Sequence, residues 1–108
     1  PTGEMCDEGD VSGLNITQKK TGRKVHGMHE WQVDITTHCM CSYNDVVLNC
    51  SGFKTLEPID PSIVRIQGKH CLLKQEIAAY PLSAFSGFKY AWKTSFPLKA
   101  LSARTACP

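Results

Sequence analysis

The chain has 108 residues and a mass of 11.9 kDa, which fits one domain over residues 1–108 because a second core would have too few residues to close. Hydrophobic residues make up 42% and charged residues 20%, which excludes an intrinsically disordered chain and a fibrous repeat. The net charge of +2 argues against nucleic-acid binding, and no apolar run approaches the roughly 20 residues that cross a bilayer. The chain also lacks the charged start and apolar stretch of a signal peptide, so a secreted form would be mature as given.

The first predicted strand lies around residues 14–17, where Leu14 and Ile16 would point inward and Asn15 and Thr17 outward. Four basic residues follow within six positions, which we expect to form a loop: Lys19, Lys20, Arg23 and Lys24.

Polar and apolar residues alternate most clearly over residues 30–36, which places the apolar residues Trp31, Val33 and Ile35 on one face of a strand. Residues 45–50 repeat the alternation after a polar stretch, residues 42–45, that predicts a turn. We therefore expect these two strands to pair as a hairpin.

The C-terminal half predicts a weaker strand at residues 63–67 and two clearer ones near the end of the chain. Phe88, Tyr90 and Trp92 share one face of the first, and residues 101–107 alternate along the second. Residues 72–80 could form a short turn of helix or the end of a strand. Five to eight short strands indicate an all-β fold, a small disulfide-stapled antiparallel β-sandwich or a partly closed barrel.

Six cysteines are spread along the chain: Cys6, Cys39, Cys41, Cys50, Cys71 and Cys107. An even count in a small chain predicts three disulfides and an oxidising, extracellular location. Cys39 and Cys41 should reach different partners, because one intervening residue would leave a strained ring. A zinc site around residues 38–41 is the weaker alternative, since no second ligand pair follows.

Two sequons agree with secretion, one at Asn15 and one at Asn49. Asn15 is the stronger acceptor, because early disulfide formation at Cys50 could hide Asn49.

The residues do not predict an enzyme, a metal site or a cofactor. The four histidines are scattered, four of the ten acidic residues gather in an N-terminal segment, and disulfides would consume every thiol. The basic loop could hold an acidic protein surface or an anionic wall polysaccharide such as pectate, or could simply be solvated. The aromatic row at residues 88–92 favours burial over sugar binding.

The order of cysteines and strands resembles the Tapetum Determinant family of secreted cysteine-rich plant proteins. The resemblance spans about residues 6–107, from Cys6 through the Trp31 to Cys39 strand, Val47 to Phe53, Cys71-Leu72 and Phe88 to Ala91, to Cys107. It implies a secreted ligand in the apoplast that binds an extracellular leucine-rich-repeat receptor kinase ectodomain and controls anther and tapetum cell fate. Exposure and charge alone nominate receptor-binding residues: the basic loop and Lys74, Gln75 and Glu76.

A second hypothesis is a cell-wall polysaccharide-binding module, because a Trp-led strand and a late aromatic strand also resemble plant β-sandwich modules of that kind. It requires an exposed aromatic row. A small inhibitor or defence scaffold ranks last, since only the disulfide content supports it.

Overall fold

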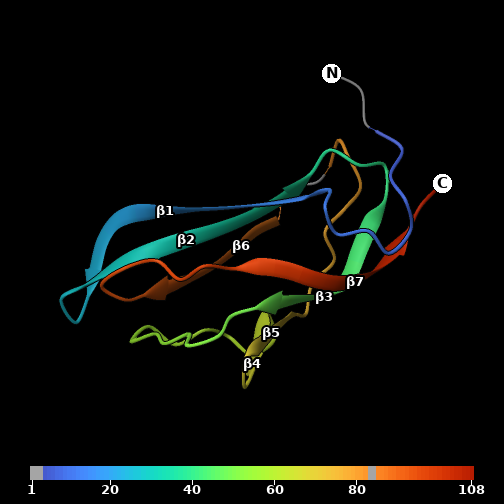
Figure 1. The fold of residues 1–108 in the computed structure, drawn as a ribbon. Helices are drawn as coiled ribbons and strands as arrows, with labels where there is room; N and C mark the ends of the chain where they lie inside the picture. The colour runs from blue at the N-terminus through green and yellow to red at the C-terminus, as the bar shows by residue number, and fades with distance from the viewer. Residues whose placement is uncertain (1–3, 83–84) are drawn as a thin grey trace.

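The computed structural model describes residues 4–82 and 85–108, which contain strands and no helix. The seven strands are β1 (Leu14–Val25), β2 (Met28–Thr37), β3 (Ser42–Asn49), β4 (Val64–Gln67), β5 (His70–Leu73), β6 (Phe85–Ala91) and β7 (Lys99–Ala106). They form two antiparallel sheets, one in the order β1-β2-β6 and one in the order β4-β5-β3-β7 (Figure 1). The predicted all-β fold is confirmed.

The alternation predicted for residues 30–36 holds in β2, where Val33 and Ile35 are fully buried. In the register of the two strands, Val33 pairs with Gln18 of β1 and Ile35 pairs with Ile16. The polar side chains of β2 lie on the other face. A two-residue turn, His26-Gly27, connects the strands, and both residues have positive φ of 50° and 79°. That backbone matches the twist of paired strands, so the turn closes β1 and β2 into a long hairpin.

The expected hairpin between the Trp31 strand and residues 45–50 is wrong, because the two strands lie in different sheets. β2 uses both of its edges for β1 and β6, whereas β3 pairs with β5 and β7. The predicted turn at residues 42–45 is instead the first half of β3. Asp45 there has φ of 51°, and the register shifts between Asn44 and Val47, so a bulge accommodates polar residues inside a strand.

The remaining predicted strands appear as β4, β6 and β7. Residues 72 and 73 end β5 rather than beginning a helix, and the chain then runs without regular structure to Ile77, which bridges Tyr43. Among the residues that the structure describes, no helix is long and apolar enough to span a membrane.

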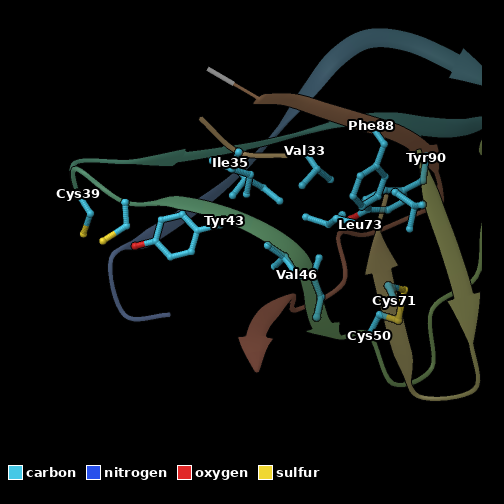
Figure 2. Close-up of a cluster of buried hydrophobic side chains, with 14 residues drawn as sticks. Val33, Ile35, Cys39, Tyr43, Val46, Cys50, Cys71, Leu73, Phe88 and Tyr90 are labelled. Carbon is cyan, nitrogen blue, oxygen red and sulfur yellow. A yellow bond between two sulfur atoms is a disulfide. The ribbon is translucent and has the colours of Figure 1, made fainter. Parts of the chain in front are cut away.

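The core lies between the two sheets (Figure 2). The three-stranded sheet contributes Val33, Ile35, Phe88 and Tyr90, and the four-stranded sheet contributes Tyr43, Val46, Leu48 and Leu73. Burial of these side chains removes apolar surface from water and is the main term that stabilises the fold.

Three disulfides join Cys6 to Cys39, Cys41 to Cys107 and Cys50 to Cys71. Cys39 and Cys41 therefore reach different partners, one holding the N-terminal segment and the other the end of β7. The loops that they close span 33, 66 and 21 residues of sequence separation, and loops of that length correspond to about 3–4 kcal/mol each in the chain-entropy model.

Candidate functional site

The four basic residues expected in a loop lie within a strand. Lys19, Lys20, Arg23 and Lys24 all belong to β1, and the turn itself is His26-Gly27. The pairing with β2 is irregular between Lys20 and Lys24, where Gly22 has φ of 91°. The expected loop is thus a bulged strand near the end of the β1–β2 hairpin, away from both chain termini (Figure 1).

The bulge divides the four cations between the two faces of the hairpin. Lys20 and Lys24 lie opposite Trp31 and His29, on the face that continues into the core. Lys19 lies opposite Gln32, and the Arg23 guanidinium reaches Glu30 at 3.3 Å, so these two belong to the outward face. The hairpin end therefore has an inward face with Lys20 and Lys24 and an outward face with Lys19 and Arg23.

Glu30 is the shared acceptor of a hydrogen-bond network on the outward face. Its side chain is only 2% exposed, although it is charged. The Thr21 hydroxyl donates to it at 2.7 Å, Arg23 donates from the same strand, and Glu57 hydrogen-bonds to it from the segment after β3. The hydrogen bonds from Glu57 and Thr21 and the positive charges of Arg23 and Lys89 lower the pKa of Glu30.

Glu57 has the opposite shift. Burial, its hydrogen bond to Glu30 and the negative charge of Glu30 raise the pKa of Glu57. Its Oε1 atom is buried and has no ordinary donor among the described residues. A proton on Glu57 that is donated to the Glu30 carboxylate satisfies both groups.

Sequence reasoning did not find this carboxyl pair, because 27 positions separate its members. The part of the network that is local in sequence is the contact of Glu30 with Thr21 and Arg23 across the hairpin.

A second polar network that the sequence did not reveal links the aromatic strand to β1. The Tyr90 hydroxyl donates to Gln18 Oε1 and accepts a hydrogen bond from the Phe96 amide at 3.0 Å. The Gln18 amide nitrogen donates to the Phe96 carbonyl at 2.7 Å. Burial raises the pKa of the Tyr90 phenol. The network fixes the segment after β6 against the hairpin.

Lys74, Gln75 and Glu76 lie elsewhere, directly after β5 of the four-stranded sheet. The Lys74 amide donates to the Ile63 carbonyl at 2.8 Å, and Glu76 accepts from Asn44 at 3.2 Å. All three residues are exposed. This segment follows the four-stranded sheet, whereas the basic residues of the hairpin lie in the three-stranded sheet, so the two groups do not share a strand surface.

The aromatic row is mostly buried. Tyr90 is 0% and Phe88 5% exposed, and Trp92 is half-buried. Phe53 and Phe96 cover Tyr90 with ring centroids 4.9 and 5.9 Å away. The row therefore packs in the core, and it does not offer the flat aromatic surface that binding to crystalline cellulose requires.

The two sequons differ in their surroundings. Asn15 is exposed on β1, an edge strand of its sheet. Asn49 is exposed at the end of β3, but its Oδ1 accepts hydrogen bonds from the Ser51 amide and hydroxyl at 3.1 and 2.9 Å. Cys50 between them is bonded to Cys71. Glycosylation of either asparagine stays a prediction.

The zinc alternative meets a chemical obstacle. Cys6, His38 and Cys39 present potential ligand atoms within 4.8 Å of one another. However, Cys6 and Cys39 are bonded to each other, so neither sulfur is a thiolate that could bind a metal. His38 instead contacts the Glu4 carboxylate at 3.1 Å.

The family comparison covers nearly the whole chain. A family model described as "Tapetum determinant 1, C-terminal" matches residues 10–107. No curated protein and no solved structure matches the chain.

Proposed function

Because this chain belongs to the Tapetum determinant 1 family, we propose that it is a secreted signalling ligand for the extracellular domain of a leucine-rich-repeat receptor kinase. The family match over residues 10–107 carries the proposal. The signal controls cell fate in the plant anther and tapetum, as the resemblance implies. Three disulfides support a location in the apoplast, because such bonds persist in oxidising compartments.

The receptor contacts, on this proposal, come from exposed charged residues on two parts of the surface. One is the outward face of the hairpin end with Lys19 and Arg23, and the other is the segment Lys74–Glu76. Charged rims of this kind steer association and contribute to partner choice. The rigid hairpin also limits the entropy lost on binding, since its residues are already ordered by strand pairing.

Binding of the oxidised protein to purified leucine-rich-repeat ectodomains tests the proposal. We expect saturable, stoichiometric binding to at least one ectodomain and loss of binding on reduction. The variant Lys19→Glu with Arg23→Gln should weaken it, and glutamine keeps a donor for Glu30. Its matched control is Lys69→Glu with Lys99→Gln, which changes the net charge equally on the other sheet.

The second segment needs its own variant. Exchanging the charges with Lys74→Glu and Glu76→Lys keeps the net charge and should weaken binding if this segment contacts the receptor. An unchanged affinity removes the segment from the interface. Failure of every ectodomain to bind saturably would contradict the proposed function.

A further inference from the structure

The inward face of the hairpin end brings two cations and two indole rings together. In the register, Lys20 lies opposite Trp31 and Lys24 lies opposite His29. Trp92 extends the same face beside His29, because its amide donates to the His29 carbonyl at 3.1 Å. The Trp31 indole nitrogen in turn donates to the Trp92 carbonyl at 3.1 Å. β1, β2 and the residue that follows β6 therefore build this face jointly.

The cations on this face lack an acidic partner among the described residues. Within residues 4–82 and 85–108, neither Lys20 nor Lys24 forms an ion pair with a carboxylate. Lys20 Nζ instead lies 5.7 Å from the centroid of the Trp31 ring, at cation–π distance. The positive charge of Lys20, followed by burial and by the charge of Lys24, lowers the pKa of His29, as expected for an imidazole near two ammonium groups.

The indoles are accessible only in part. Trp31 and Trp92 are half-buried, Lys20 and Lys24 are exposed, and Phe96 packs beside Trp92 with ring centroids 6.3 Å apart. The rings are thus held in place, and the exposed ammonium groups of Lys20 and Lys24 remain accessible to a ligand.

We propose that this inward face, Lys20, Lys24, His29, Trp31 and Trp92, is a binding site for an anionic carbohydrate made of uronic acid residues. Each such residue combines a carboxylate with a flat ring face that bears C–H groups. The carboxylates meet the two ammonium groups, and the C–H groups of the sugar ring faces meet the exposed parts of the indole rings. An acidic peptide matches the cations equally well, but its flexible carboxylate side chains offer no flat apolar ring for the indoles.

This site does not rest on the proposed function. It uses the inward face of the hairpin, whereas the proposed receptor contact uses Lys19 and Arg23 on the outward face. A protein could therefore bind a uronate polymer and fail to bind a receptor, or the reverse, and the two experiments report on different side chains.

The chain has two tryptophans, and both belong to the site, so their fluorescence reports binding directly. We expect oligogalacturonate of about ten residues to change the emission saturably and to bind more weakly as salt rises. The variant Lys20→Gln with Lys24→Gln should weaken binding roughly five- to tenfold, since two exposed ion pairs are lost. Lys69→Gln with Lys99→Gln removes the same charge from the other sheet and should bind like the unmodified protein.

Specificity is tested with two further polymers. Fully methyl-esterified oligogalacturonate keeps the ring faces and removes the charge, and poly-glutamate keeps the charge and lacks the rings. Both should bind at least about fivefold more weakly than oligogalacturonate. Equal binding of poly-glutamate, equal loss in the two double variants, or no saturable change in emission would each overturn the proposal.

Discussion

Glu30 and Glu57 share a hydrogen bond between two carboxyl groups, one on β2 and one on the segment that follows β3. Two ionised carboxylates in hydrogen-bond contact repel each other, so the pair is most stable with one proton. Glu30 is held ionised by Thr21, Arg23 and the proton of Glu57. The contact holds residues 55–57 against the hairpin end, beside Ala91 of β6, whose amide donates to the Thr55 hydroxyl at 3.0 Å.

The carboxyl pair predicts a pH dependence of stability. The raised pKa of Glu57 means that its contribution is present below about pH 4.3, the ordinary glutamate range, and is lost as pH rises through the raised value. The lowered pKa of Glu30 works in the other direction, since its contribution is lost as pH falls through the lowered value. The pair therefore stabilises the fold most between the lowered pKa of Glu30 and the raised pKa of Glu57.

The variant Glu57→Gln separates these effects. Glutamine still donates to Glu30 but cannot ionise, so the decline on the alkaline side should disappear while the acid side stays. Thermal unfolding midpoints measured from pH 3 to pH 9 show this directly. Glu8→Gln, an exposed residue of the N-terminal segment, is the control and should keep the profile of the unmodified protein. Parallel profiles for Glu57→Gln and the unmodified protein would refute the shared proton.

Two buried tyrosine hydroxyls should respond in opposite ways to removal. Tyr90→Phe leaves Gln18 Oε1 and the Phe96 amide without their partner and should cost about 1–3 kcal/mol of unfolding free energy. Tyr43→Phe removes a buried hydroxyl that has no hydrogen-bond partner among the described residues, so it should be neutral or stabilising. Urea denaturation of both variants measures the difference. A larger loss for Tyr43→Phe would contradict the hydrogen-bond assignment.

The disulfides should contribute in the order of the loops that they close. Replacing Cys41 and Cys107 by alanine opens the longest loop, with a sequence separation of 66, and frees the end of β7. Replacing Cys50 and Cys71 opens the shortest, with a separation of 21. The chain-entropy model gives losses of about 4 and about 3 kcal/mol. Chemical denaturation compares the two, and a greater loss from Cys50 and Cys71 would contradict the ranking.

Glycan occupancy should differ between the two sequons in a eukaryotic secretory host. Asn15→Gln should reduce the mass of the secreted protein by one glycan, because Asn15 and Thr17 are exposed on an edge strand. Asn49 should carry less glycan, since the Cys50–Cys71 bond lies inside its sequon. Cys71→Ser should therefore raise the occupancy of Asn49, measured by mass spectrometry after enzymatic release. If the occupancy of Asn49 does not rise in this variant, the disulfide does not limit glycosylation of Asn49.

The alternation of side chains predicted most strands and the faces that they bury. Val33 and Ile35 point into the core as their spacing indicates, and Leu14 and Ile16 pack against it. Alternation did not predict partners, because a strand has two similar hydrogen-bonding edges and its pattern does not distinguish them. The expected pairing of residues 30–36 with residues 45–50 failed for this reason.

For the candidate sites, too, the sequence identified residues but did not place them relative to one another. The sequence identified the cluster of basic residues from Lys19 to Lys24, since charge is visible without a fold. It could not place Lys20 and Lys24 on one face and Lys19 and Arg23 on the other, because the bulge around Gly22 breaks the simple alternation. The spacing placed Trp92 on one face with Tyr90, but only the fold brings it beside His29 and Trp31, through a hydrogen bond to each.

By itself, the sequence determined the all-β class, the disulfide-bonded character and the residues able to fill the core, because composition and periodicity are local properties of the chain. Only the tertiary structure decided which strands pair, which cysteines bond, and that Glu30 meets Glu57. These contacts join residues far apart in the chain. They form because burying the whole core fixes the mutual positions of the strands, a condition that no short stretch of sequence contains.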